Sequence, residues 1–171
     1  GLEGSIRPGH FKGVATIVLK LFNIIQPHFS FFGQKDAQQL SVLRKMTEDL
    51  NVNTKIVVCP TAREKDGLAM SSRNVYLTGK QRKDAAYLYK ALEYARRKIT
   101  LENYNRDIDF LKGQMSKLIK SRETATKIDY ISFNDYATLE EVKSLKSDKN
   151  RVILISLAVR FGKVRLIDNI V

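Results

Sequence analysis

The stretch FSFFGQKDAQQLSVLRKMTEDLNVNTKIVVC, from Phe29 to Cys59, decides the fold of the first part of the chain. Its opening aromatic run, Phe29–Phe32, predicts a buried strand that Gly33 ends. Apolar residues recur at helical spacing over Ala37–Leu50, and Thr54–Cys59 predicts a second buried strand. A strand, a helix and a strand in this order indicate a βαβ unit with parallel strands.

The residues before this stretch predict a loop and a helix. Glycines and a proline over Gly1–Gly13 indicate irregular structure, and Val14–Ile25 has helical periodicity that Pro27 ends. Two strands are too few for a parallel sheet covered on both faces. We therefore expect the chain to carry only part of an α/β domain.

The pattern changes after Pro60, where a polar loop over Thr61–Asn74 contains the turn signal Asp66-Gly67. Two helices and three strands are then predicted, in the order Gly79–Lys98, Asn103–Arg122, Lys127–Asn134, Arg151–Val159 and Val164–Ile167. A hairpin turn at Phe161–Lys163 would join the last two strands. Helices followed by antiparallel strands favour a small α+β domain.

Composition indicates a globular protein outside the membrane, with 43% hydrophobic and 28% charged residues. No run approaches the roughly 20 apolar residues of a membrane-spanning helix, and the first residues do not resemble a signal peptide. The single cysteine, Cys59, favours a reducing compartment, so we expect a cytoplasmic location. No cluster has metal-ligand spacing, so no protein-bound metal is expected.

The net charge of +12 allows two interpretations. Lysines and arginines could bind polyanions, or they could form an ordinary solvated surface with a phosphate site added. They are spread along the whole chain, and no nucleic-acid-binding motif accompanies them. We expect no nucleic-acid partner and keep a non-catalytic fragment that binds polyanions as the alternative function.

One candidate site follows the first predicted strand. Gly33, Lys35 and Asp36 lie where that strand ends and a helix begins, and open α/β sheets bind ligands at this edge. Lys35 could contact a phosphate and Asp36 could accept hydrogen bonds from a ribose. The alternative is that Asp36 caps the helix and Lys35 is solvated.

A second candidate site lies in the glycine-containing loop over Asp66–Asn74. Ser71, Ser72 and Arg73 offer two hydroxyls and a planar guanidinium, which suit the oxygens of a polyphosphate. The alternative is a polar surface loop. Near the start of the chain, His10 could act as an acid or base, or as a structural hydrogen-bonding group.

Together these segments resemble the pantothenate synthetase (pantoate–β-alanine ligase) family. The matching phrases are Leu2-Glu-Gly4, Arg7-Pro-Gly-His-Phe11, Gly13-Val14, Lys20-Leu-Phe-Asn23, Phe32-Gly-Gln-Lys-Asp36, Gln38-Gln-Leu40, Asp49-Leu-Asn51, Pro60-Thr61, Arg63-Glu64, Asp66-Gly-Leu-Ala-Met-Ser-Ser-Arg-Asn74 and Arg165-Leu-Ile-Asp-Asn169. The resemblance spans essentially the whole chain and is densest before residue 77. Each phrase alone is weak, but the ordered set is specific.

The resemblance implies a fold of two parts. Residues 1–61 would be the C-terminal part of a Rossmann-like nucleotidyltransferase domain that binds ATP and pantoate. Residues 62–171 would form an α+β lid domain with a three-stranded antiparallel sheet and a phosphate-binding loop. The implied activity is condensation of pantoate with β-alanine through a pantoyl adenylate, with ATP and Mg²⁺ as cofactors. The family's typical homodimer is also expected.

The resemblance also implies roles for individual residues. Gly33 and Asp36 would meet the ribose, Lys35 the phosphates and Gln39 pantoate, while Ala62 and Met70 would lie by the adenine and Ser71, Ser72 and Arg73 would hold the β- and γ-phosphates. Lys35, Ser71, Ser72 and Arg73 would be the catalytic residues. Arg7 and His10 lie in a family motif without an assigned role.

The largest departure of the chain from the family is a region that it lacks. Family members carry further N-terminal residues with a His-x-Gly-His phosphate motif and a second pantoate-binding glutamine, and neither histidine here lies in such a motif. We therefore expect the chain to be incomplete and inactive alone.

Overall fold

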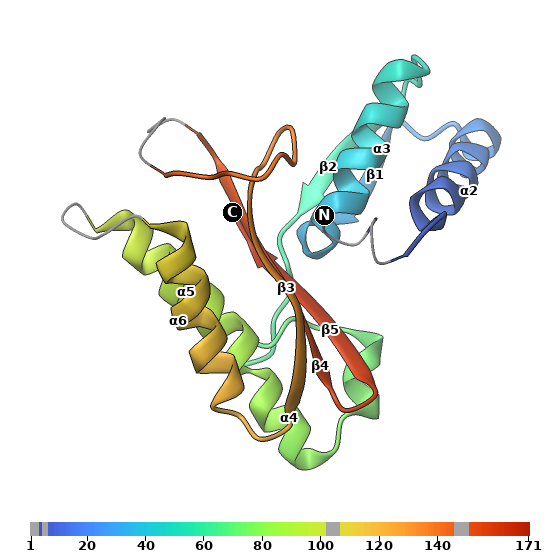
Figure 1. Cartoon of the computed structure of the whole chain (residues 1–171). Coiled ribbons are helices and arrows are strands. Elements are labelled where there is room, and N and C mark those ends of the chain that lie inside the picture. The colour runs from blue at the N-terminus through green and yellow to red at the C-terminus, as the bar shows by residue number, and fades with distance from the viewer. Residues whose placement is uncertain (1–3, 5–6, 102–106, 146–150) are drawn as a thin grey trace. The chain divides into compact units, whose positions relative to one another are not determined.

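A computed structural model of the chain describes residue 4 and residues 7–101, 107–145 and 151–171 (Figure 1). The chain divides into two compact units, Gly1–Thr61 and Ala62–Val171. Each unit is described by itself below.

The first unit contains a parallel strand pair with helices. Its described elements are α2 (His10–Ile25), β1 (Phe29–Gly33), the 3-10 turn η1 (Gln34–Asp36), α3 (Ala37–Asp49) and β2 (Lys55–Cys59). In these residues β1 pairs in parallel with β2 alone, with Phe29 opposite Lys55 and Gly33 opposite Cys59. The predicted βαβ unit is therefore confirmed.

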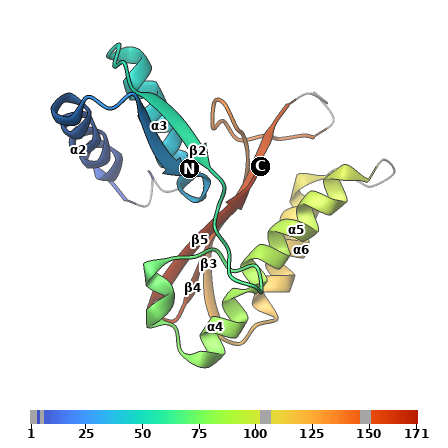
Figure 2. The same ribbon diagram turned by 180° about the vertical axis from the view of Figure 1, so that it is seen from behind.

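The two faces of this strand pair differ in exposure. Helix α3 lies against one face, as Figures 1 and 2 show from opposite sides, and it buries Leu40 and Leu43. The Phe32 ring meets Phe22 of α2 edge-on, with ring centroids 6.5 Å apart. Phe29 and Phe31 alternate with Phe32 and remain 56% and 66% exposed. The prediction of a buried strand was wrong, because the described helices cover only the Phe32 side.

Helix boundaries in this unit also differ from expectation. Helix α2 begins at His10, so the prediction of a loop through Gly13 was wrong at its end. Gly9 has a left-handed φ of 75° just before the helix, and the Gly13 amide donates to the Gly9 carbonyl at 3.1 Å. One glycine inside a helix costs only about 1 kcal/mol, so Gly13 does not prevent it. Helix α3 ends at Asp49, and Leu50 is exposed rather than part of its packed face.

The second unit combines helices with an antiparallel sheet. Its described elements are η2 (Ser72–Tyr76), α4 (Gly79–Ala85), α5 (Tyr87–Thr100), α6 (Ile108–Lys120), β3 (Ala125–Asp135), β4 (Ile153–Phe161) and β5 (Val164–Ile170). Among the described residues the strand order is β3-β4-β5, all antiparallel, which confirms the predicted three-stranded sheet. Gly162, with φ 61°, makes the predicted turn between β4 and β5.

The helices of this unit differ from the prediction at two places. The single helix predicted over Gly79–Lys98 is two helices, because the Ala86 amide donates to the nearby Asp84 carbonyl and interrupts the regular ladder. Neither glycine nor proline marks this break in the sequence. The predicted start of the next helix at Asn103 lies outside the described residues. Helix α6 begins at Ile108, where the Asp107 side chain accepts backbone hydrogen bonds.

The core of the second unit lies between the helices and the sheet. Helices α5 and α6 lie side by side next to the three strands (Figure 1). The largest fully buried side chains of this unit are Leu68, Leu88, Leu92, Leu111, Met115, Ile119, Phe133, Leu154, Leu157 and Phe161. Burying a side chain of this size contributes about 1.5–3 kcal/mol, so this unit holds most of the described apolar stabilisation.

Candidate functional site

The first group of predicted site residues lies at the carboxyl end of the parallel strand pair. Gly33 ends β1 and lies opposite Cys59, which ends β2, so both strands end at the same edge. The turn η1 then carries Lys35 and Asp36 directly into α3. Gln39 follows in the first turn of α3 and is half-buried. This edge is where open parallel sheets bind ligands.

Asp36 does not act as a side-chain helix cap. It occupies the position before α3, but its carboxylate accepts no capping hydrogen bond from the described residues of that helix. The side chain is exposed, so its oxygens are accessible to a ligand. Capping by Asp36 was the structural alternative to a ribose contact, and the geometry contradicts it.

The neighbouring glutamines differ in environment. The Gln38 side-chain oxygen accepts a hydrogen bond from the Gly4 amide at 3.2 Å, which connects Gly4 to α3. Gln39, the predicted pantoate contact, is next to it in the same helical turn. Of the two side-chain amides, it is therefore that of Gln38 that binds the Gly4 backbone.

The second group of predicted residues lies at one hairpin of the second unit. The chain over residues 62–70, called the 62–70 hairpin below, closes through an antiparallel bridge between Arg63 and Ala69. The Met70 amide donates to the Ala62 carbonyl at 2.9 Å, which brings the two predicted adenine contacts together. Both residues are exposed, Met70 by 55%.

The predicted phosphate-binding residues, Ser71, Ser72 and Arg73, directly follow this hairpin in the sequence. Ser71 precedes η2, and its Oγ accepts a hydrogen bond from the Arg73 amide at 3.2 Å. Ser72 and Arg73 are exposed, and Ser71 is half-buried. Two hydroxyls and a guanidinium over three residues offer several donors to the oxygens of one anion.

The predicted residues thus form one group in each unit. Gly33, Lys35, Asp36 and Gln39 belong to the first unit, while Ala62, Met70, Ser71, Ser72 and Arg73 belong to the second. Each group is held together locally, the first by the turn from β1 into α3 and the second by the 62–70 hairpin and η2. The role of each residue stays a prediction.

Arg7 and His10 contact each other. An Arg7 Nη1 lies 3.1 Å from His10 Nε2, and the His10 ring is tilted against Phe11 with centroids 5.1 Å apart. His10 is the first residue of α2. These contacts favour the interpretation of His10 as a structural hydrogen-bonding residue.

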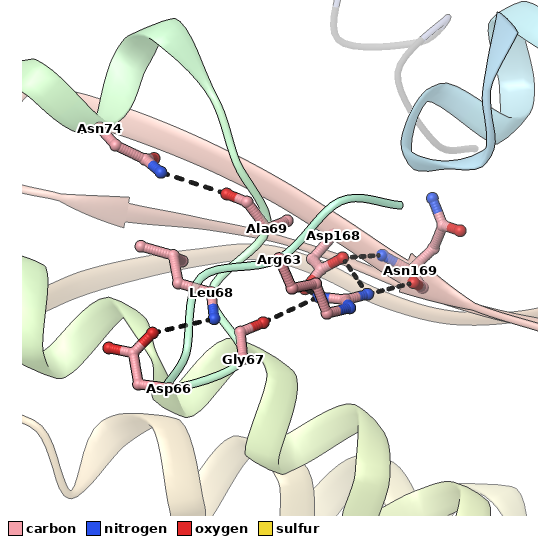
Figure 3. A network of polar contacts seen from close by, with 8 residues as sticks. All are labelled: Arg63, Asp66, Gly67, Leu68, Ala69, Asn74, Asp168 and Asn169. Atoms are coloured by element: carbon pink, nitrogen blue, oxygen red, sulfur yellow. Dashed lines mark hydrogen bonds and ion pairs between the residues drawn. The ribbon is translucent and has the colours of Figure 1, made fainter. Parts of the chain in front are cut away.

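Arg63 and Asp168, for which no role is predicted, form a buried ion pair in the second unit (Figure 3). Arg63 Nη1 and Nη2 donate to the two Asp168 carboxylate oxygens at 2.6 and 3.0 Å. The residues are 105 positions apart, so no local pattern links them. The only indication of a role in the sequence is that both residues lie in segments that resemble the family.

A second ion pair holds the tip of the 62–70 hairpin. Arg82 of α4 donates twice to the Asp66 carboxylate, at 2.6 and 3.2 Å. The Arg82 guanidinium holds the pKa of Asp66 below its ordinary value. Asp66 also accepts a hydrogen bond from the Leu68 amide at 3.2 Å, which closes the turn.

Two further properties concern only the described residues. None of their His, Cys, Asp and Glu side chains gather in threes that could hold a metal ion. Within the same residues, every helix is too short or too polar to span a membrane.

Comparisons with known proteins give one consistent result. The family described as pantoate-beta-alanine ligase matches residues 1–171. A pantothenate synthetase from Caldicellulosiruptor saccharolyticus is 54% identical over 168 residues, and one from Acetivibrio thermocellus is 48% identical over 170 residues. The matches cover 98% and 99% of this chain but 57% and 58% of those proteins.

Solved structures agree with the sequence matches. A pantothenate synthetase from Thermus thermophilus has a TM-score of 0.87 and 38% identity, covering 98% of this chain and 58% of its own. A pantoate-beta-alanine ligase from Francisella tularensis, complexed with beta-gamma ATP and beta-alanine, has a TM-score of 0.67 and 34% identity, covering 100% of this chain and 54% of its own. The chain thus spans little more than half the length of these relatives, and it belongs to the pantoate-beta-alanine ligase family.

Proposed function

We propose that this chain supplies part of the site in which pantoate and β-alanine are condensed at the expense of ATP. The observation that carries the proposal is the family match over all 171 residues. The Francisella tularensis relative is complexed with beta-gamma ATP and beta-alanine, which supports these two ligands. Pantoate follows from the family description.

The proposed reaction has two steps. A carboxylate oxygen of pantoate attacks the α-phosphorus of ATP, and the bond to the β-phosphate breaks, which releases pyrophosphate and leaves pantoyl adenylate. The amine of β-alanine then attacks the acyl carbon and loses a proton, and AMP leaves. Mg²⁺ bound to the polyphosphate would neutralise charge during the first step.

The residues of the first unit would hold the nucleotide sugar and pantoate. The exposed Asp36 carboxylate would accept ribose hydroxyls, and Gly33 at the end of β1 would allow the backbone to approach the sugar. Lys35 would contact phosphate oxygens, and Gln39 would bind pantoate. The position of all four at the carboxyl edge of parallel strands supports these roles.

The residues of the second unit would hold the base and the outer phosphates. Ala62 and Met70, paired across the 62–70 hairpin, would contact the adenine. Ser71, Ser72 and Arg73 would bind the β- and γ-phosphates and stabilise charge on the departing pyrophosphate. Ser71, Ser72 and Arg73 would be the catalytic residues of this unit, as Lys35 would be of the first.

We further propose that the 171 residues alone do not complete the reaction and that they associate into a homodimer. Exposed apolar side chains in the first unit support both statements, notably Ile17, Leu21, Ile24, Ile25, Phe29 and Phe31, which are 47–75% exposed. Sedimentation velocity tests the dimer, which a single monomeric species at micromolar concentration would contradict. A cytoplasmic location stays a prediction from the half-buried free cysteine, Cys59.

An assay of AMP formation tests the proposed activity. The chain is mixed with the segment of the Caldicellulosiruptor saccharolyticus relative that lies outside the match, together with ATP, Mg²⁺, pantoate and β-alanine. We expect AMP only when both segments and both substrates are present. AMP from the chain alone would contradict its proposed dependence on a second segment, and no AMP from any mixture would contradict the ligase assignment.

The net charge of +12 keeps polyanion binding as a second candidate. Binding of that kind would weaken steeply with salt and would not distinguish ATP from another polyphosphate without adenosine. A titration with inorganic tripolyphosphate beside ATP separates the candidates. Equal affinity for both compounds would favour the polyanion-binding alternative.

A further inference from the structure

The Arg63 side chain connects the 62–70 hairpin with β5 (Figure 3), and it also contacts α5. Besides Asp168, its guanidinium donates to the Gly67 carbonyl at 3.1 Å and to the Asn169 carbonyl at 3.2 Å. Its carbon centre lies 4.0 Å from the centroid of the Tyr89 ring on α5. We call these residues (Arg63, Gly67, Tyr89, Asp168 and Asn169) the Arg63 cluster. The cluster joins the tip of the 62–70 hairpin to β5 and α5.

The ion pair in this cluster is buried and its carboxylate is well hydrogen-bonded. The side chains of Arg63 and Asp168 are 17% and 1% exposed. Besides its two bonds from Arg63, Asp168 accepts the Asn169 amide at 2.8 Å. A buried ion pair often adds little to stability compared with an apolar replacement, so stability alone is a weak reason for this arrangement. Its geometry, however, fixes where the hairpin tip lies.

The hairpin itself is closed by short backbone contacts. The Glu64 amide donates to the Leu68 carbonyl at 2.8 Å, and the Gly67 amide donates to the Glu64 carbonyl at 2.9 Å. Gly67 has a φ of 92°, and a Cβ placed on it would lie 2.3 Å from Tyr89 Cδ1. The tip therefore packs directly on the ring over which Arg63 lies.

The hairpin leads without an intervening residue into Ser71–Arg73. Met70 makes the last cross-hairpin bond, and the Asn74 side-chain amide donates back to the Ala69 carbonyl at 3.1 Å. Ser71–Arg73 is thus held at both ends, by the hairpin before it and by Asn74 after it. Movement of the hairpin would displace the hydroxyls and the guanidinium together.

We propose that Arg63 is a positioning residue for Ser71–Arg73, acting through the Gly67 carbonyl and Asp168. The inference rests on the proposed phosphate-binding role of Ser71–Arg73. In this role Arg63 acts through its contacts with Gly67 and Asp168 and not through the phosphates themselves. Its planar fork binds a carboxylate and two carbonyls at once, a geometry that the single ammonium of lysine does not reproduce.

The test uses the whole chain and the variants Arg63→Lys and Asp168→Asn. Arg165→Lys is the control. Arg165 lies on β5, as Asp168 does, is 13% exposed, and pairs with the 5% exposed Asp129 at 2.7 Å. Amide hydrogen exchange of Glu64, Gly67 and Met70 reports on the hairpin, and exchange over Ile153–Phe161 reports on the core of the unit.

We expect both test variants to raise hairpin exchange by about tenfold or more while core exchange stays unchanged. The control should leave hairpin exchange unchanged, because Arg165 pairs with Asp129 and not with the hairpin. Unchanged hairpin exchange in Arg63→Lys would overturn the proposal. So would equal acceleration of hairpin and core in both test variants, which indicates a purely structural role.

A second measurement links the hairpin to the phosphates. Arg63→Lys should weaken ATP binding by roughly fivefold or more but leave AMP binding unchanged, because AMP lacks the phosphates that Ser71–Arg73 would hold. Equal weakening of both ligands would overturn the positioning role. If the unsubstituted chain binds no ATP, it does not hold the nucleotide by itself, and the exchange result alone decides whether Arg63 holds the hairpin.

Discussion

At the scale of single residues, the second unit depends on a few side chains and one glycine around the 62–70 hairpin. Gly67 has a left-handed φ of 92° and leaves no space for a methyl group beside Tyr89. Arg63 then holds the carbonyl of the same residue at 3.1 Å. The hairpin tip is therefore defined by backbone conformation, ring packing and a charged donor together.

Replacing Gly67 with alanine should destabilise the second unit by about 1–3 kcal/mol, because the new Cβ is strained at positive φ and overlaps the Tyr89 ring. Urea denaturation measures the change in the free energy of unfolding. Gly113→Ala is the matched control: Gly113 lies inside α6 with open space around its Cβ position, so alanine should stabilise by about 0.5–1 kcal/mol. Equal stability of Gly67→Ala and the unsubstituted chain would contradict this prediction, because the hairpin tip would then accommodate the methyl group without loss of stability.

The sequence draws attention to some of the residues around the hairpin and not to others. The loop containing Ser71, Ser72 and Arg73 stands out because hydroxyls and a guanidinium follow a glycine-containing turn. The partnership of Arg63 with Asp168 could not be predicted, since residues 105 positions apart meet only through the tertiary fold. The position of Asp36 at the start of α3 could be predicted but its contacts could not, because a helix-start pattern does not say whether the side chain caps the helix.

At the scale of helices and strands, the second unit joins its elements through defined polar contacts. Helix α4 begins with a capping box, in which Thr78 accepts from the Gln81 amide while the Gln81 side chain accepts from the Thr78 amide. The Gln81 side chain also donates to the Phe161 carbonyl at the end of β4, at 3.2 Å. The cap thus connects the start of α4 with the sheet.

Removing the cap should destabilise the unit. Thr78→Ala loses the hydroxyl that accepts from the Gln81 amide, so we expect a loss of about 1 kcal/mol in the free energy of unfolding. Thr78→Ser keeps the hydroxyl and serves as the control, with little change expected. If alanine and serine give the same midpoint in urea, the capping box does not contribute to stability.

The buried carboxylate of Asp129 on β3 accepts hydrogen bonds from Arg160 on β4 and Arg165 on β5. Burial alone would raise the pKa of Asp129, but hydrogen bonds from Arg165 and Arg160 outweigh burial and hold the pKa of this group below its ordinary value. The stabilisation from Asp129 is therefore present above the pKa of the unfolded chain, about 3.9. It is lost as the pH falls through the folded-state pKa.

This linkage predicts a pH-dependent effect of Asp129→Asn. The variant should be less stable than the unsubstituted chain at neutral pH, and the difference should shrink as the pH falls below about 4. Urea denaturation at neutral and acidic pH measures it. A difference that stays constant over this range, or grows in acid, would contradict the assigned pKa direction.

Element prediction succeeded where periodicity and turn residues agreed. The β4–β5 hairpin, with Gly162 at φ 61°, was readable from the sequence, as were β1, α3 and β2. The break between α4 and α5 was not, because the interruption at Ala86 comes from a backbone hydrogen bond without a glycine or proline. The exposure of Phe29 and Phe31 was also missed, since an apolar run does not show how many of its faces are covered.

At the scale of the whole molecule, the two units differ in how much core they hold. In the described residues of the first unit, the buried apolar side chains are Phe22, Ala37, Leu40 and Leu43. The second unit has a contiguous core drawn from α4, α5, α6 and all three strands of its sheet. Two strands with one covered face give little independent stability.

We therefore expect unequal local stability. Backbone amides of β1 and β2 should exchange with solvent at least about tenfold faster than those of β4 in the same sample. Hydrogen exchange measured by mass spectrometry resolves these segments, and β5 provides an internal comparison within the second unit. Equal protection of β2 and β4 would contradict the difference inferred from their packing.

Ser71–Arg73 is proposed to bind the outer phosphates of ATP. Calorimetric titration of the whole chain with ATP and Mg²⁺ tests it most directly, beside Arg73→Ala and a control, Arg97→Ala, whose side chain on α5 is 81% exposed. We predict saturable binding that Arg73→Ala weakens by about 1–3 kcal/mol and Arg97→Ala leaves unchanged. Binding that both variants weaken equally, or that neither weakens, would contradict the claim.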